Sequence, residues 1–224
     1  PITVVNLKIY QQTHEESYLT DGKRLYNSMK TIRWGIGPGY RGYENAVVMQ
    51  AALYLYEITG EQIYLSDAQQ LGYSMNAVYI SWKSQRLNEY GRWGGHDMTD
   101  AYVHMYNVDH NPYWLTIAGG YTSYLRNKCM DSQGYYPEVW NDTSKNITKV
   151  IGLVDQASAL AAFYKMATTS GAEARTEEPV VIFKESDYNA TREGGNFSIG
   201  LKLGNYTQSD LTFLGHTNNR FVFS

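Results

Sequence analysis

YEITGEQIYL (56–65) is one of three copies of a ten-residue pattern on which the fold depends. YQQTHEESYL (10–19) and YNVDHNPYWL (106–115) repeat it at spacings of 46 and 50 residues. Each copy begins with Tyr, passes through a polar turn and ends in an aromatic residue followed by Leu. A period of this length is typical of stacked hairpins in which a helix, a tight turn and a second helix form one unit.

Apolar residues flank each turn at helical rather than strand spacing. Leu71, Met75 and Val78, for example, recur three and four positions apart, which places them on one face of a helix. We therefore expect seven helices before residue 170, arranged as antiparallel hairpins with Tyr18, Tyr64 and Tyr113 in equivalent positions. The expected helices span residues 2–10, 19–32, 47–56, 65–82, 101–106, 113–125 and 154–169.

Composition and charge exclude several classes of protein. Of the 224 residues, 43% are hydrophobic and 18% are charged, which is enough apolar material for a packed core. The net charge of -3, without a cluster of Lys and Arg, excludes the concentrated positive face that a nucleic-acid partner needs. No apolar run approaches the roughly 20 residues of a bilayer span, so we expect no membrane span.

The composition changes after residue 170. Residues 171–179 are small and polar and end in Pro179, which is typical of a linker. Beyond it, residues 180–183, 197–202 and 220–223 have the composition of short strands separated by Gly and Asn turns. We therefore expect a helical domain over 1–170, a linker over 171–179 and a small all-β module over 180–224.

The end of the chain is rich in sites for N-glycosylation. The five Asn-x-Ser/Thr sequons begin at Asn141, Asn146, Asn189, Asn196 and Asn205. This density is about twice the chance expectation and favours a secreted, extracellular glycoprotein. Cys129 is the only cysteine, so it cannot form a disulfide within the chain.

Aromatic residues are concentrated in Gly-rich connections between the expected hairpins. WGIGPGY (34–40) and YGRWGG (90–95) are two such connections. Flat aromatic faces with a polar rim suit sugar rings, although Tyr also fills interfaces where one end of the ring is buried and its hydroxyl is wet. The candidate substrate-binding aromatic residues are Trp34, Tyr40, Tyr43, Tyr90 and Trp93.

Two sequence signatures resemble those of glycoside hydrolase family 76, the endo-α-1,6-mannanases. YENAV (43–47) followed by LYEITGEQIYL (55–65) is similar to the family's Tyr-Asn-Gln-Gly segment and its hairpin, and QASAL (156–160) is similar to its closing helix. The resemblance covers the first 170 residues and implies part of an (α/α)6 toroid that binds or processes α-mannan-type polysaccharide. It also adds Asn45 to the candidate substrate-binding residues.

The catalytic residues of that family do not match this sequence. The family uses an adjacent Asp-Asp pair ahead of a helix, whereas this chain contains no Asp-Asp, and the repeat register would place the pair before Pro1. Whether the protein is an enzyme stays open, and we expect this chain alone to be inactive. Asp97 and Asp100 are the remaining candidates for a catalytic role.

HDMTDAYVH (96–104) offers a second interpretation of the same acidic residues. On a helix His96, Asp100 and His104 share one face, a spacing that suits metal ligands, and a carboxylate beside His also suits acid–base chemistry. No other expected helix supplies a matching set of ligands. We therefore favour a polar helix end that lines the binding cleft, and we expect no metal.

The segment after the linker resembles a single Greek-key motif of the βγ-crystallin family. FKESDYNA (183–190) and GNYTQSDL (204–211) are similar to the motif's first and later turns. The family's calcium signature would fall on NNRFVF (218–223), which lacks the signature's hydroxyl residues, so we expect no cofactor.

These observations support two functions. The first is a secreted protein resembling family 76 that binds or processes α-mannan while its catalytic pair lies outside this chain. The alternative is a non-catalytic extracellular sugar-binding or structural glycoprotein on the same scaffold, possibly one that forms filaments. Because repeat units cannot cover their own apolar faces, the expected partners are polysaccharide and either further copies or missing segments of the same protein.

Overall fold

A computed structural model describes residues 1–33, 42–81, 83–145, 152–169, 188–193 and 196–201. The chain divides into two compact units, Pro1–Glu173 and Ala174–Ser224, which we describe separately. None of the described helices is both long enough and apolar enough to cross a membrane.

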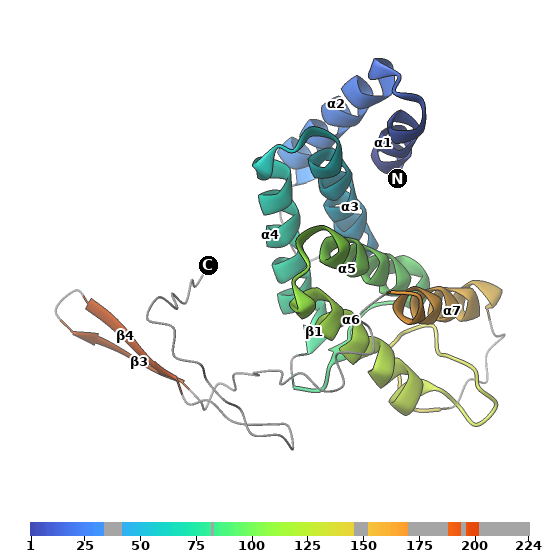
Figure 1. Cartoon of the computed structure of the whole chain (residues 1–224). Coiled ribbons are helices and arrows are strands. Elements are labelled where there is room, and N and C mark those ends of the chain that lie inside the picture. The colour runs from blue at the N-terminus through green and yellow to red at the C-terminus, as the bar shows by residue number, and fades with distance from the viewer. Residues whose placement is uncertain (34–41, 82, 146–151, 170–187, 194–195, 202–224) are drawn as a thin grey trace. The chain divides into compact units, whose positions relative to one another are not determined.

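The first unit is helical in its described part, as the repeat predicts (Figure 1). The prediction of seven helices in this region is confirmed, with ends that differ from the predicted ones by up to five residues. The α-helices are α1 (Ile2–Thr13), α2 (Glu16–Arg33), α3 (Gly42–Thr59), α4 (Gln62–Tyr79), α5 (His96–Asp109), α6 (Pro112–Tyr124) and α7 (Leu153–Ala167). Shorter elements are the two-residue strands β1 (Ile80–Ser81) and β2 (Arg86–Leu87) and the π-helical turns η1 (Gly91–Gly95) and η2 (Leu125–Cys129).

Three tight turns with the same backbone geometry join the helices of each hairpin. The residue that ends the first helix adopts the left-handed conformation and donates its N–H to the carbonyl of the Tyr four residues earlier. These residues are His14, Gly60 and His110, with φ of 57°, 71° and 55° and N–H···O distances of 2.7, 2.7 and 2.8 Å.

A side chain just before the left-handed residue closes each turn. The Thr13 and Thr59 hydroxyls and the Asp109 carboxylate accept from the backbone N–H two residues later, at 3.3, 3.1 and 2.9 Å. The second helix therefore starts at the same place in each repeat.

This register corrects one expectation. The residue equivalent to Tyr18 and Tyr64 is Trp114 rather than Tyr113. All three lie four positions after the left-handed residue of their turn, and each donates its backbone N–H to the carbonyl three residues earlier. Trp114 is fully buried, and its ring stacks on Tyr102 with centroids 6.1 Å apart. Gly72 makes room for it, since a Cβ there would lie 2.8 Å from Cζ3 of Trp114.

The helices form two rows. Helices α1, α3, α5 and α7 pack side by side in chain order and make up the first row. Helices α2, α4 and α6 make up the second row, and each packs on its own hairpin partner and on the next helix of the first row (Figure 1). The core lies between the rows and includes Met49, Leu53 and Met75.

A buried carboxylate ties two second-row helices together. Asp67 of α4 is 6% exposed and accepts hydrogen bonds from the Tyr26 hydroxyl at 2.8 Å and from the Lys30 ammonium at 2.6 Å, both on α2. Burial, together with the hydrogen bond to Asp67, raises the pKa of Tyr26. Tyr26 therefore donates to Asp67 at any ordinary pH.

The described part of the second unit is one antiparallel hairpin. Strand β3 (Tyr188–Glu193) pairs with β4 (Asn196–Leu201), with Tyr188 opposite Leu201 and Glu193 opposite Asn196. The predicted strand 197–202 overlaps β4, whereas β3 lies where no strand is predicted. YNATRE has little strand character of its own, and β3 depends on its pairing with β4. The predicted strands 180–183 and 220–223, the linker 171–179 and the rest of the Greek-key motif lie outside the described residues.

Candidate functional site

The candidate site lies at the end of the first row where helices α3 and α5 begin, which we call the N-terminal end of the row. Because α3 and α5 are the first helices of successive hairpins, their first turns lie at the same end of the row, and Lys165 in the last turn of α7 reaches Asp100 near the start of α5. The turn η1 packs against all three of these helices. This arrangement brings the connection before α5 next to the start of α3.

Glu89 joins these segments. Its carboxylate is 7% exposed and accepts two backbone N–H groups, from Gly42 at 2.7 Å and from Tyr90 at 2.8 Å. Its own carbonyl accepts the N–H of Trp140 at 3.0 Å. Glu89 could not be predicted from the sequence, because an isolated Glu in a loop gives no signal of the chain segments that it contacts.

A second buried pair lies between α3 and α4. The Asn45 amide donates to the Tyr79 hydroxyl at 3.3 Å, and both residues are buried. Burial, followed by the negative charge of Glu89, raises the pKa of Tyr79 to about 12. Tyr79 is therefore a neutral phenol at physiological pH, and Asn45 holds α3 against α4.

The glycines of η1 serve close packing within the protein. A Cβ at Gly91 would collide with the indole of Trp140, and one at Gly95 would lie 2.6 Å from its Cε3. Trp140 is fully buried, and its backbone and that of Val139 pair with residues 89 and 90. These two glycines are needed where the chain lies directly on Trp140, rather than for close approach to a ligand.

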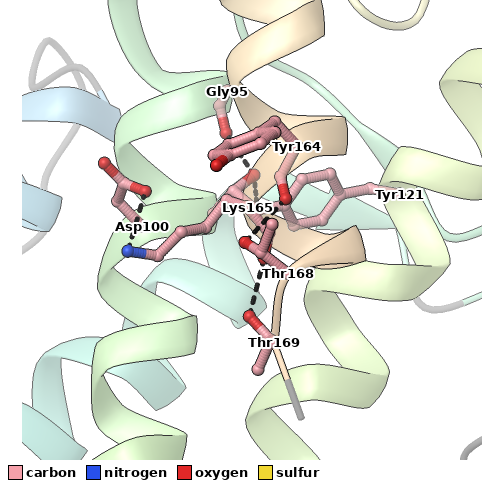
Figure 2. Close-up of polar contacts among 8 residues, drawn as sticks. Gly95, Asp100, Tyr121, Tyr164, Lys165, Thr168 and Thr169 are labelled. Carbon is pink, nitrogen blue, oxygen red and sulfur yellow. Dashed lines mark hydrogen bonds and ion pairs between the residues drawn. The ribbon is translucent and has the colours of Figure 1, made fainter. Parts of the chain in front are cut away.

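The acidic residues at the start of α5 have separate partners. Asp97 is half-buried, and its Oδ2 lies 3.5 Å from Nε2 of His96. Burial raises the pKa of Asp97, an effect that His96 partly offsets. Asp100 forms an ion pair with Lys165 of α7 at 3.6 Å (Figure 2).

His104 completes this side of α5. Its Nε2 lies 3.1 Å from Glu57 of α3, and its ring lies against Tyr54 with centroids 4.6 Å apart. His96, Asp100 and His104 thus share a helix face, but each contacts a different segment. Among the described residues, no group of three or more His, Cys, Asp or Glu side chains could hold a metal ion.

Behind these groups the N-terminal end of α5 is fixed by buried hydroxyls. Thr99 donates to the Gly95 carbonyl at 2.8 Å and shares a 2.8 Å hydrogen bond with the Tyr121 hydroxyl on α6. Figure 2 shows Gly95 and Tyr121 close to the end of α7 that carries Lys165, Thr168 and Thr169. The end of the row is therefore held by contacts among α5, α6 and α7.

Three of the predicted substrate-binding residues have described side chains at this end. Tyr43 is the second residue of α3 and Tyr90 directly precedes η1, and both are half-buried. Asn45 is only 5% exposed, and its amide donates to the Tyr79 hydroxyl. The backbone of Trp93 lies in η1, whereas its side chain, Trp34 and Tyr40 lie outside the described residues.

Three of the five sequons fall in the described residues. Asn141 is half-exposed, and its amide donates to the Asn88 side chain at 3.0 Å. Asn189 lies in β3 and Asn196 in β4. Asn146 and Asn205 lie outside the described residues.

The fold is similar to that of several solved structures. An α-mannanase of glycoside hydrolase family 76 from Bacteroides thetaiotaomicron superposes with a TM-score of 0.63 at 21% identity, over 78% of this chain and 51% of its own. A family 76 mannosidase from the same species gives 0.64 at 19% identity, over 77% and 54%. A Listeria innocua protein gives 0.62 at 15% identity, over 79% and 54%.

These likenesses identify the helical fold of the chain. The chain spans about half the length of the structures it matches. No protein-family sequence model matches it, and neither does the sequence of any curated protein.

Proposed function

We propose that this chain recognises α-mannan-type polysaccharide at the N-terminal end of the first row, as part of a secreted protein related to glycoside hydrolase family 76. The observation that carries the proposal is the likeness of its two helical rows to family 76 structures. Tyr43 and Tyr90, whose aromatic rings suit stacking on sugar, flank the Glu89 contact at that end. The sequons support the secreted location.

We further propose that the described acidic residues do not catalyse glycoside hydrolysis. A glycosidase needs an acid and a second carboxylate across the scissile bond. The chain has no adjacent Asp pair, and Asp100 already pairs with Lys165. The chemistry of the family would therefore depend on residues outside this chain.

The exposed apolar side chains of α7 favour a second candidate function. Leu153, Leu160 and Tyr164 are 83%, 68% and 69% exposed and recur at helical spacing. On α1, the first helix of the row, Ile2 and Val5 are 70% and 52% exposed. The second candidate function is therefore a non-catalytic glycoprotein that binds sugar or serves a structural role. Its copies would associate through these exposed apolar faces.

Calorimetric titration with α-1,6-mannotetraose tests the first proposal, with β-1,4-mannotetraose as the linkage control. We expect binding of the α-1,6 oligosaccharide and about tenfold weaker binding after Tyr90→Ala, a loss of roughly 1.4 kcal/mol. Tyr73→Ala is the matched control, because it removes an exposed Tyr of α4 that lies against Tyr113 at the start of α6, at the opposite end of the hairpins from the proposed site. Equal affinity for both oligosaccharides, or no binding of either, would contradict the proposal.

A further inference from the structure

The carboxylate of Glu89 bridges two segments that the sequence separates by 47 residues. Oε2 accepts the N–H of Gly42, the first residue of α3, and Oε1 accepts the N–H of Tyr90. Both donors lie at a candidate sugar-binding tyrosine. Gly42 directly precedes Tyr43, and the second N–H belongs to Tyr90 itself. Glu89 therefore sets the distance between the backbones that carry them.

The energetics of this bridge are local and strong. Hydrogen bonds to an ionised carboxylate are shorter and about twice as strong as neutral ones, and the 2.7 and 2.8 Å distances fit that class. The negative charge also lies at the N-terminus of α3, where the helix dipole favours it. Because Glu89 is buried, neither acceptor can be replaced by solvent without opening the site.

The surrounding residues leave Glu89 little freedom. A Cβ at Gly94 would overlap Cγ of Glu89, and one at Gly42 would lie 3.3 Å from the same atom. The carbonyl of Glu89 also accepts from Trp140, which fixes the backbone beneath the side chain. Both ends of the Glu89 side chain are thus held in place.

We propose that Glu89 is a positioning residue, which holds the start of α3 and the connection before η1 in the arrangement that binds sugar. Its consequence for affinity rests on the proposed function. Glu89 would act without touching substrate, through the backbone N–H groups of Gly42 and Tyr90.

Glu89→Gln tests this role at nearly constant size. The amide keeps one acceptor and turns an NH2 group towards an N–H donor, so one of the two bridging hydrogen bonds is lost. If the arranged state falls to about a tenth of the population, the apparent Kd for α-1,6-mannotetraose rises about tenfold. Amide hydrogen exchange of Gly42 and Tyr90, followed by NMR, should accelerate in the same variant.

Asp67→Asn is the matched control. It also neutralises a buried carboxylate that accepts two hydrogen bonds, but that carboxylate ties α2 to α4. It should lower global stability and leave both the mannotetraose Kd and the relative protection of Gly42 and Tyr90 unchanged. If Glu89→Gln acted only by lowering global stability, the two variants would change the mannotetraose Kd and the exchange of Gly42 and Tyr90 to the same extent. That result would overturn the positioning role.

Glu89→Asp keeps the charge on a side chain that is one methylene shorter. This variant should bind mannotetraose more tightly than Glu89→Gln does and should keep one of the two amides, Gly42 or Tyr90, protected from exchange. It replaces Glu89→Gln in the test if that variant does not fold. Unchanged Kd and unchanged exchange in both variants would overturn the inference. If the unmodified chain binds no mannotetraose, the proposed function fails, and the exchange of Gly42 and Tyr90 still decides whether Glu89 positions them.

Discussion

At the scale of single residues, the polar side chains of the first row pair across helices. Glu57 on α3 contacts His104 on α5, Asp100 on α5 contacts Lys165 on α7, and Lys8 on α1 lies 5.4 Å from the centre of the Tyr54 ring on α3. Among these groups, Asp100 and His104 are the ones that the sequence alone offers to catalysis or to a metal. Whether Asp97, Asp100 or His104 has a catalytic role can therefore be tested by substitution.

We expect no hydrolysis of α-1,6-mannan by this chain. Asp97 lies beside His96, and Asp100 beside Lys165, so no second carboxylate is placed opposite either of them by the described contacts. Product analysis after incubation with α-1,6-mannan measures this, with a family 76 mannanase as the positive control. Turnover that disappears in Asp97→Asn or Asp100→Asn would show that one of these residues is catalytic.

The pair between Glu57 and His104 should make stability depend on pH. Burial opposes the ionisation of Glu57, but the hydrogen bond and charge of His104 and a hydrogen bond from Gln11 outweigh it, so its pKa is lowered. A lowered pKa stabilises the fold above the unfolded value of about 4.3, and this contribution is lost as the pH falls through the folded pKa. The wild type should therefore lose stability on acidification that Glu57→Gln does not lose.

Urea unfolding at pH 6 and at pH 3.5 measures this difference. The Glu57 side chain is 34% exposed, so solvent screening keeps the effect within about 1 kcal/mol. Glu61→Gln, which removes the more exposed pair with Lys23 and leaves Glu57 in place, is the control and should lose nearly as much stability between the two pH values as the wild type. The same loss on acidification in Glu57→Gln as in the wild type would contradict the prediction.

At the scale of elements, the hairpin turn repeats its backbone conformation with different residues. Gly60 takes the left-handed conformation without penalty, whereas His14 and His110 take it with a Cβ. Each His ring lies edge-on to the Tyr four residues earlier, with centroids 6.0 and 6.1 Å apart. The ring contact offsets part of the strain in the first and third turns.

Gly60→Ala should destabilise the protein by about 1 kcal/mol, because Ala at φ 71° carries the left-handed penalty and has no ring to offset it. There is no steric contribution, since a Cβ at this position meets nothing within 4 Å. Thermal or urea unfolding measures the change, and Ser66→Ala on the exposed side of α4 is the surface control. Equal stability of Gly60→Ala and the wild type would show that the turn has relaxed.

The elements were predictable from the sequence to the extent that their signals are local. Spacing and turn residues predict the seven helices in the described part of the first unit, but adjacent aromatics at Tyr113 and Trp114 conceal which one occupies the repeat position. Strand β3 was missed for a related reason, because only its partner strand specifies it.

The candidate site was predictable only in outline. The Gly-rich connections indicate one end of the row, and Tyr43 and Tyr90 both lie at that end. Glu89, Tyr79 and Trp140 were missed, because their roles come from partners about 35 to 50 residues away in the sequence. The sequence gives no sign that Asn45 is buried and donates to Tyr79, so its assignment to substrate binding stays a prediction.

At the scale of the whole molecule, the exposed apolar residues of α7 should promote self-association. Burying Leu153, Leu160 and Tyr164 would recover roughly 1.5 to 3 kcal/mol for each large apolar side chain fully covered. We expect light scattering to give a particle larger than the 25.5 kDa chain, after allowance for glycans.

Leu160→Glu should shift this equilibrium towards the monomer, because it places a charge in the middle of the apolar face. Ser28→Glu, on an exposed polar position of α2, is the control and should leave the particle size unchanged. A stable monomer of the unmodified chain over a wide concentration range would contradict the prediction.

The two-row arrangement also determines how cooperatively the first unit unfolds. Each hairpin contacts mainly its immediate neighbours, so the middle hairpin α3–α4 is supported from both sides, while α1–α2 is supported from one. In such a linear array the free energy of local opening is graded along the chain, as in a one-dimensional Ising model. Fraying would begin at α1–α2 and spread inwards, which leaves the segments joined by Glu89 among the last to open.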